Sequence, residues 1–456
     1  MKYLNFSVTE PEFKDTIYSV REFGAKGDGF TNNTEAINNA ITHASENGGG
    51  VVTVPRGIFF TGPITLKNDV NLHLQAGAVL LFSSNVDDYP LVMVNYEGSQ
   101  AYRCTSPINA KGATNIAITG KGVINGSGDP WRPVKKFKVP DRRWRKLISS
   151  GGAINVLNGG EETWWPTERA RIGHDLLSTY GPNLKDYDTC YECRDFLRPC
   201  LVYLEDCHNI LIKNVTFKNS PAWSIHPFLC DNITVKDIIV SNLDTAQNSD
   251  GIDIDCCHNV KILDSTFDVG DDGICMKSGK NEEGRARGIP TFNVYINNCT
   301  VFHGHGGFVL GSEMSGGLHN IEISECTFIT TDCGVKLKSC VGRGGVIENI
   351  YIHGINMMHL PKEAIVFTTG YDIDSHEGQE VSEEEIPEFR NVIVENITCT
   401  HCVTPISIVG LKERPIHDIT LKNIRIASRQ LEKVYKYAEN IKEQNVVITE
   451  LLGEHY

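Results

Sequence analysis

The chain has 456 residues, of which 40% are hydrophobic and 22% charged, and this balance is typical of a folded protein with a large core. It excludes a disordered or collagen-like chain. The formal net charge of −14 disfavours nucleic acid and anionic membranes as partners, so an anionic substrate would need a local cluster of basic side chains.

No apolar run approaches the length of a membrane span, and the first six residues do not have the order of a secretory signal. We therefore expect a cytoplasmic protein that does not enter a membrane. The fifteen cysteines are an odd number and are most simply reduced in that compartment. Cys190/Cys193 and Cys399/Cys402 have metal-ligand spacing, but the pairs lie far apart in the sequence, and we favour packed thiols over a zinc site.

Residues 20–50 are predicted to form an N-terminal cap. A helix over residues 34–47 begins at Thr34, which we expect to cap it, and ends at a run of three glycines. Its apolar residues follow the i, i+3, i+4, i+7 spacing of one helix face, at Ile37, Ala40, Ile41 and Ala44. Short strands are predicted after it at 51–54, 64–66, 70–74 and 79–82.

Residues 127–200 form a polar, aromatic insertion that contains Trp131, Trp144, Trp164 and Trp165. Within it, residues 131–146 are rich in Lys and Arg. This basic stretch is either a solvated loop or one wall of a cleft that attracts carboxylates. An insertion of this length most often builds a wall or lid.

A repeated phrase begins with Asn and continues with branched apolar residues at alternate positions. The alternation is that of a strand with one buried face, and most copies from residue 205 onward follow one another at a roughly constant spacing. The copies start at Asn115, Asn209, Asn232, Asn259, Asn293, Asn320, Asn349 and Asn391, with a degenerate copy at Asp418.

These copies cannot bury their apolar faces alone, and the segments between them hold no helix long enough for a βαβ crossover. We therefore predict an all-β chain of stacked parallel coils, a β-helix, in one domain over residues 1–456, with its coils between about residues 20 and 430. Cys207, Cys230 and Cys257 each stand two residues before a marker Asn, which predicts a ladder of small side chains inside the coils. A propeller would need short hairpins that are absent from the pattern.

Acidic residues and one histidine gather where the repeat is clearest. Asp271 and His305 each lie 12 residues after their own marker Asn. Equal offsets predict that they occupy the same position on neighbouring coils, about 4.8 Å apart. Asp250 precedes Asp271 by about one coil, so Asp250, Asp271, Asp272 and His305 should share one face.

Taken singly, each of these Asp residues is equally well explained as a turn former beside glycine. Together, neighbouring carboxylates raise one another's pKa, which lets one remain an acid while another acts as a base. The glycines on both sides of His305 leave space for a ligand at its ring.

The chain resembles the polygalacturonase family of glycoside hydrolases, family 28, whose members are right-handed parallel β-helices that hydrolyse galacturonic acid linkages in pectin with inversion. The resemblance extends from residues 23–29 to residues 334–338, nearly the whole chain. Its motifs are Asn248-Ser249-Asp250, Gly270-Asp271-Asp272, Gly304-His305-Gly306 and Lys336-Leu337-Lys338. The last motif has Lys where the family usually has Arg, and this replaces a planar fork with a point charge.

The resemblance implies a role for each of these side chains. Asp271 would be the general acid, Asp250 and Asp272 would hold and activate the attacking water, and His305 would keep Asp271 in its acidic form or share its proton. Lys336 and Lys338 would bind the sugar carboxylate. Inverting enzymes place acid and base roughly 6.5 to 9.5 Å apart, which we expect here.

The chain looks closest to the bacterial exo-acting members, in which insertions close one end of the groove. On this resemblance Asn248, His226, Glu313 and Tyr371 are further substrate-binding residues, and no metal or other cofactor is needed. The expected partner is an anionic galacturonan, as polymer or oligomer.

Three other functions stay open. A rhamnogalacturonan or other modified-galacturonan hydrolase is encouraged by Lys336. A pectate lyase would use Ca²⁺ on the clustered acids and a basic residue to remove a proton. A non-catalytic carbohydrate-binding β-helix would not need the alignment of Asp271 with His305.

Overall fold

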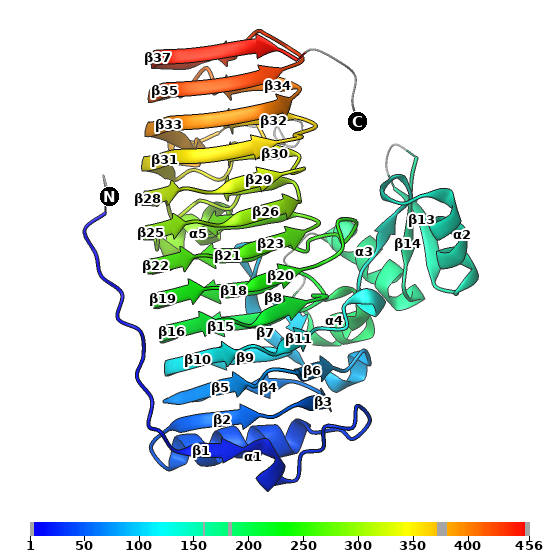
Figure 1. The fold of residues 1–456 in the computed structure, drawn as a ribbon. Coiled ribbons are helices and arrows are strands. Elements are labelled where there is room, and N and C mark those ends of the chain that lie inside the picture. Colours follow the sequence, from blue (N-terminus) through cyan, green and yellow to red (C-terminus); the bar gives the residue numbers. More distant parts are fainter. Residues whose placement is uncertain (1–3, 158–159, 181–184, 372–380, 452–456) are drawn as a thin grey trace.

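The computed structural model describes residues 4–157, 160–180, 185–371 and 381–451. They form a right-handed parallel β-helix whose N-terminal end is covered by helix α1 (Thr34–Glu46) (Figure 1). The predicted fold class is confirmed. Successive coils stack along one axis, and an insertion projects from the side of the stack (Figure 1).

Each coil contributes strands to three faces, and the strands of each face pair in parallel with those of the next coil. The first face carries β1 (Ile17–Ser19), β2 (Gly50–Val54), β5 (Val70–Leu74), β10 (Thr114–Gly120), β16 (His208–Lys213), β19 (Asp231–Lys236), β22 (His258–Leu263), β25 (Thr291–Asn297), β28 (Leu318–Ser324), β31 (Val346–Met358), β33 (Glu388–Cys402), β35 (Ile416–Ser428) and β37 (Ala438–Glu450).

The second face is continuous with the first at the long strand β31, because β31 pairs both with β28 of the first face and with β29 of the second. It carries β3 (Gly57–Thr61), β6 (Ala78–Phe82), β11 (Val123–Asn125), β17 (Thr216–Lys218), β20 (Ile239–Ser241), β23 (Thr266–Val269), β26 (Thr300–His303) and β29 (Thr327–Ile329).

The third face bears the clustered acids. It carries β4 (Ile64–Thr65), β9 (Ile108–Lys111), β15 (Val202–Glu205), β18 (Ile225–Phe228), β21 (Ile252–Asp255), β24 (Asp272–Lys277), β27 (Gly306–Leu310), β30 (Cys333–Lys338), β32 (Glu363–Thr368), β34 (Thr404–Val409) and β36 (Val434–Lys436).

The backbone conformation of the marker residues explains why Asn recurs once in each copy of the repeat. Every marker Asn, and Asp418, has a left-handed backbone with φ between 51° and 58°, a conformation that Asn tolerates better than other residues with a side chain. Several of their amides also bond to one another along the stack: Asn209 Nδ2 donates to Asn115 Oδ1 at 3.0 Å, and Asn293 Nδ2 to Asn259 Oδ1 at 3.0 Å.

The coils extend further than predicted. We expected them to end near residue 430, but β36 and β37 continue the stack to Glu450. Asn440, whose φ is 51° and whose amide bonds to Asp418, continues the same ladder. The final coil was missed because Glu443 stands where the other copies have their second apolar residue after the marker.

The predicted helix at the N-terminal end is present as α1, with Ile37, Ala40, Ile41 and Ala44 buried. The predicted cap at Thr34 is wrong, because Thr34 is the first helical residue. Its hydroxyl oxygen instead accepts a bond from the Gly62 amide. Asn33 precedes the helix, but its side chain binds backbone groups of the neighbouring loop and strand.

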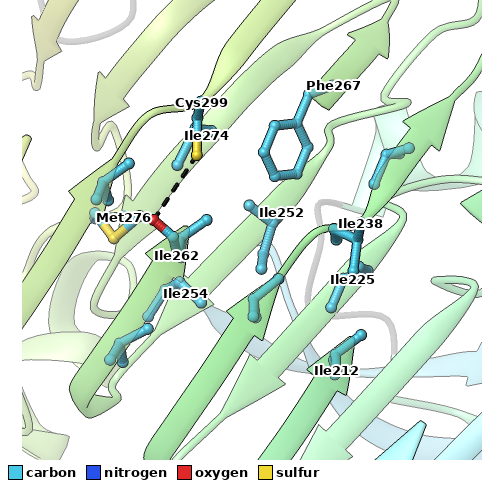
Figure 2. Close-up of a cluster of buried hydrophobic side chains, with 14 of the residues drawn as sticks. Ile212, Ile225, Ile238, Ile252, Ile254, Ile262, Phe267, Ile274, Met276 and Cys299 are labelled. Carbon is cyan, nitrogen blue, oxygen red and sulfur yellow. Dashed lines mark hydrogen bonds between the residues drawn. The ribbon is translucent and has the colours of Figure 1, made fainter. Parts of the chain in front are cut away.

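The interior of the coils is filled by columns of branched apolar side chains from all three faces. Ile212, Ile225, Ile252, Ile274 and Phe267 are at most 1% exposed and lie together inside the stack (Figure 2). The predicted cysteine ladder is part of this interior. The Cys207 amide donates to Cys230 Sγ, and the Cys230 amide to Cys257 Sγ, at 3.3 Å each.

The insertion lies between β11 and β15. Its elements are a 3-10 helix (Asp129–Trp131), β12 (Val134–Lys135), a 3-10 helix (Lys136–Lys138), α2 (Asp141–Ser149), β13 (Ala153–Leu157), β14 (Glu161–Trp165), α3 (Glu168–Tyr180), α4 (Tyr187–Glu192) and a 3-10 helix (Arg194–Phe196). Strands β12, β13 and β14 form a small antiparallel sheet of their own.

Two further segments cover the third face. A hairpin of β7 (Leu91–Tyr96) and β8 (Ser99–Cys104) follows a 3-10 helix (Val86–Asp88), and α5 (Asn281–Arg287) follows β24. Two more 3-10 helices lie at Val20–Phe23 and Glu383–Glu385. Within the described ranges, no helix is both long enough and apolar enough to span a membrane.

Candidate active site

Strand pairing brings the predicted catalytic residues onto adjacent coils. Ile252 of β21 pairs with Ile274 of β24, so Asp250 and Asp272, each two residues earlier, share one position. The Gly251 amide donates to the Asp272 carbonyl at 2.9 Å, and Asp272 pairs with Gly306 on the next coil. The cluster therefore stands at the N-terminal ends of strands on three successive coils.

Asp271 and His305 are neighbours, as their equal spacing from the marker residues predicts. The His305 amide donates to the Asp271 carbonyl at 3.1 Å, and His305 Nδ1 lies 3.1 Å from Asp271 Oδ1. Asp271 also accepts backbone bonds from Asp272 at 3.0 Å and from Asn248 at 3.3 Å. Both carboxylate oxygens of Asp271 are thus held in place.

The three carboxylates are closer than the sequence analysis expects. One oxygen from each of Asp250, Asp271 and Asp272 lies within 4.8 Å of the others. The expected separation of acid and base, roughly 6.5 to 9.5 Å, is not met by these closest atoms, so spacing alone does not support inversion. A group of oxygens this close is also able to share a water or a cation.

Asp250 is 3% exposed, and its Oδ1 accepts no hydrogen bond from any residue that the structure describes. Burial raises the pKa of the Asp250 carboxyl well above its usual range, and the negative charges of Asp253 and Asp271 add to the effect. These surroundings favour the protonated form of Asp250 in the free protein.

Asp272 stands beside a cation. Lys338 Nζ lies 2.7 Å from Asp272 Oδ2, and both side chains are at most 10% exposed. Burial alone would lower the pKa of Lys338, but the Asp272 charge outweighs it and the net shift is upward. Asp272 Oδ1, like Asp250 Oδ1, is buried without a partner among the described residues.

The electrostatics of Asp271 depend strongly on His305. Burial raises the pKa of Asp271, but the His305 hydrogen bond and the charges of His305, Lys338 and Lys138 outweigh it, so the pKa falls below its usual value. In the free protein His305 therefore favours the ionised form of Asp271.

Lys138 is a residue of this site that the sequence analysis did not single out. It comes from the insertion, and its Nζ lies 3.3 Å from His305 Nε2. Only the general prediction of a basic cleft wall pointed toward it. Its own position is not visible from the repeat, because residues 127–200 do not follow the coil spacing.

A cleft of about 500 Å³ runs beside the cluster along the turns between the second and third faces. The insertion forms one wall of it and the turns of five coils form the floor. Its lining residues are Lys135, Phe137, Lys138, Asp244, Thr245, Gln247, Asn248, Gly270, Asp271, His303, Gly304, His305, Thr330, Asp332 and Lys362.

Lys336 and Tyr371 lie on the C-terminal side of the cluster. The ammonium groups of Lys336 and Lys338 are 5.9 and 5.4 Å from the centre of the Tyr371 ring. Tyr371 is 41% exposed, so this rim is open to a ligand. Lys338 is already paired with Asp272, and of the two lysines Lys336 has the more accessible charge.

The remaining predicted substrate-binding residues are divided between the cleft and the interior. Asn248 lines the cleft, and its Oδ1 accepts a bond from buried Arg198 at 2.8 Å. Glu313 is paired with Lys277 at 3.0 Å, and Lys277 Nζ is also 3.6 Å from Asp253.

His226 is placed differently from the prediction. It is 0% exposed, and its Nε2 lies 3.4 Å from Asp255 Oδ2 beneath the β7–β8 hairpin. A substrate in the cleft does not reach this ring, so His226 is a buried structural histidine. Asp253 was missed, although counting register positions along the third face aligns it with Lys336.

Comparison with known proteins fits this geometry. The model of the glycosyl hydrolases family 28 matches residues 172–447. A second family model, described as rhamnogalacturonase A/epimerase, pectate lyase-like, matches residues 17–127.

Two relatives illustrate the similarity in sequence. A probable polygalacturonase of Vitis vinifera is 29% identical over 423 residues, which cover 90% of this chain and 74% of the relative. An exo-poly-alpha-D-galacturonosidase of Dickeya chrysanthemi is 29% identical over 397 residues, which cover 84% of this chain and 62% of that longer relative.

Two solved structures are similar over almost the whole chain. The hyperthermoactive exopolygalacturonase of Thermotoga maritima has a TM-score of 0.81 at 30% identity and covers 97% of this chain and 94% of its own. The family 28 exopolygalacturonase of Yersinia enterocolitica has a TM-score of 0.76 at 25% identity, covering 97% of this chain and 76% of its own. The chain belongs to the glycosyl hydrolases family 28 and is a glycoside hydrolase.

Proposed function

We propose that this enzyme hydrolyses α-1,4-linked galacturonic acid in polygalacturonate or oligogalacturonides, with inversion and from a chain end. The observation that carries the proposal is the Asp271–His305 pair beside two buried carboxylates, in a cleft that also presents Lys135, Lys138 and Lys362. Similar proteins named polygalacturonase or exopolygalacturonase support galacturonan as the substrate.

In the proposed reaction Asp271 protonates the glycosidic oxygen. It must gain a proton for this task, and the field of Lys138, Lys338 and His305 opposes that in the free protein. A galacturonate carboxylate bound at the lysines would offset this field and raise the pKa of Asp271. His305, 3.1 Å away, is placed to share a proton with it.

The water would be held between the other two carboxyls. Asp250 Oδ1 and Asp272 Oδ1 are both buried and have no partner among the described residues, so each has a lone pair for a water molecule. Lys338 beside Asp272 favours Asp272 as the base, while protonated Asp250 orients the water. Attack from this side and protonation by Asp271 would invert the anomeric carbon.

The decisive experiment is a time course of products from polygalacturonate, trigalacturonate and rhamnogalacturonan, analysed by thin-layer chromatography and mass spectrometry. We expect monogalacturonate as the first and dominant product from the first two, with a slow fall in polymer viscosity. Proton NMR at early times should show the β-anomer produced from the α-linkage. Release of the α-anomer would refute inversion, and no cleavage of either galacturonan would refute the substrate.

A rhamnogalacturonan or other modified-galacturonan hydrolase is the second candidate. It is favoured by Lys336 in place of the usual Arg and by the description of the family model that matches residues 17–127. Faster cleavage of rhamnogalacturonan than of polygalacturonate in the same time course would select it.

A lyase is distinguished by its products and its metal. Lyase products are unsaturated and absorb in the ultraviolet, and Ca²⁺ on the acidic cluster would be required. We expect no ultraviolet product and no loss of activity in EDTA. A cytoplasmic location also stays a prediction, which fractionation of the source cells would test.

A further inference from the structure

The third face differs on the two sides of the catalytic cluster. Pairing of Ile225 with Ile252 aligns Trp223 with Asp250, and the Ser224 amide donates to the Asp250 carbonyl at 2.9 Å. Trp223 therefore occupies, one coil toward the N-terminus, the position that Asp250 and Asp272 occupy on the following coils. A single coil spacing is about 4.8 Å.

Trp223 is covered by Tyr96 from the β7–β8 hairpin. Their ring centres are 5.1 Å apart with planes 22° from parallel, and the two residues are 3% and 6% exposed. Arg103 lies over the Tyr96 ring, 4.0 Å from its centre, and Lys277 Nζ lies 4.7 Å from the centre of the Trp223 ring. Because both rings are almost fully buried, neither offers a face for a sugar to stack on.

The hairpin that carries Tyr96 is fixed at its tip. Glu97 and Gly98 both have positive φ, of 50° and 79°, as a two-residue turn between strands requires. The Lys280 amide donates to the Gly98 carbonyl at 3.2 Å, and the Gln100 amide donates to Glu283 of α5 at 2.9 Å.

Asn95, close to the turn of the hairpin, is also tied to the third face. Asn95 Nδ2 donates to Asp255 Oδ2 at 2.7 Å, and the Asn95 amide donates to the Tyr203 hydroxyl at 3.0 Å. Outward-facing residues on three successive coils, Tyr203, His226 and Asp253, are at most 5% exposed as a result of this covering. The outer face is open again at Lys336 and Tyr371, on the other side of the cluster.

We infer that the Tyr96–Trp223 stack, held by the hairpin, is the closed end of the substrate cleft and the determinant of chain-end specificity. This inference rests on the proposed function. The stack stands one coil from Asp250, so it leaves space for one sugar on that side of the scissile bond. The insertion of residues 127–200, predicted to be a wall or a lid, contributes Lys135, Phe137 and Lys138 to the side of the cleft.

The test compares wild type with Tyr96→Ala, which opens the end, and Tyr96→Phe, which keeps the stacked ring. Met93→Ala is the matched control, because Met93 lies on the same hairpin but is 37% exposed. Phe137→Ala tests the insertion wall. Each variant is assayed for the ratio of di- and trigalacturonate to monogalacturonate at early times on polygalacturonate.

We expect Tyr96→Ala to raise this ratio by about tenfold, which is the scale of discrimination that a steric pocket provides. Tyr96→Phe, Met93→Ala and Phe137→Ala should keep the wild-type ratio. A second variant, in which residues 94–103 are replaced by a two-glycine turn, should behave as Tyr96→Ala does. Because it removes the stacked ring together with its support, a rearrangement of the hairpin in Tyr96→Ala does not affect its result.

Three outcomes would overturn the inference while leaving galacturonan hydrolysis intact. In the first, Tyr96→Ala and the shortened hairpin are folded and active but release monogalacturonate as wild type does. In the second, Phe137→Ala alone changes the ratio. In the third, wild type itself gives mixed oligomers from the start. Failure of wild type to cleave any galacturonan would instead refute the proposed function on which the inference rests.

Discussion

At the scale of single residues, three aspartates of the same chemical type stand in three different surroundings. Asp250 is buried beside other acids, Asp272 is beside the Lys338 ammonium group, and Asp271 is bonded to His305. The pKa of Asp250 is therefore raised and that of Asp271 lowered, although the side chains are identical.

Replacing Asp271 by Asn removes the transferable proton and keeps the shape of the side chain. We expect kcat on polygalacturonate to fall by a factor on the order of 10² to 10⁴, with substrate binding and fold retained. Steady-state kinetics and circular dichroism measure both. Retention of more than about a tenth of wild-type kcat would exclude Asp271 as the acid.

Lys138→Met should change the pH dependence of the reaction. The Lys138 charge lowers the pKa of Asp271, together with His305 and Lys338, so its removal should raise that pKa. Because the acid must be protonated, the descending limb of log kcat/KM against pH should move to higher pH. Lys136→Met is the control, since Lys136 is on the same segment but pairs with Glu162 away from this cleft. An unchanged limb in Lys138→Met would contradict the electrostatic role.

Lys338 and Lys336 should respond differently to substitution by Ala. Lys338→Ala leaves buried Asp272 without its partner, which should cost about 3–5 kcal/mol of unfolding free energy and also abolish activity. Lys336→Ala should lower kcat/KM by about tenfold with stability nearly unchanged. Thermal unfolding and kinetics separate the two effects. If Lys338→Ala were as stable as wild type, the ion pair would not hold the site together.

The sequence predicts the pairing of Asp271 with His305 because both are fixed by the coil repeat. It does not predict the pairing of Lys338 with Asp272, because Lys338 was assigned to the substrate and lies two coils away from Asp272. Lys138 lies outside the repeat altogether. The burial of His226 depends on the hairpin above it, which comes from a distant part of the sequence.

At the scale of elements, the left-handed Asn residues combine two stabilising effects. Asn293 has a φ of 55° and its amide bonds to Asn259 at 3.0 Å. Asn293→Gly keeps the backbone conformation and loses the bond, which should cost about 1 kcal/mol. Asn293→Ala also forces a side chain without polar atoms into the left-handed region, which should cost about 1–2 kcal/mol more.

Urea denaturation of the two variants measures this difference. Equal stability of Asn293→Gly and Asn293→Ala would mean that the amide ladder, and not the backbone conformation, explains the repeat. The strands themselves were predictable because the alternation is strict in almost every copy. The sequence predicts that the insertion exists but not its internal structure, because its helices and strands are too short to show a clear hydrophobic periodicity.

At the scale of the whole molecule, α1 protects the edge of the first coil. Ile41 is 0% exposed on the inner side of α1. Ile41→Asp should displace the helix, since a buried charge without a partner costs several kcal/mol, and expose an unpaired strand edge to other chains. Size-exclusion chromatography should show aggregation, while the remaining monomer keeps its specific activity. Asn39→Asp, on the exposed side of α1, should stay monomeric, and a monomeric Ile41→Asp would show that the cap is dispensable.

The insertion interrupts the chain without interrupting the stack. Strands β9, β10 and β11 precede it and pair directly with β15, β16 and β17 that follow it. Lengthening a connection between two fixed ends costs only about 0.6 kcal/mol of closure entropy for each doubling of its length. The turns of this scaffold therefore accept large additions at almost no thermodynamic cost, and the walls of the cleft are free to diverge while its catalytic floor, set by the coil register, stays the same.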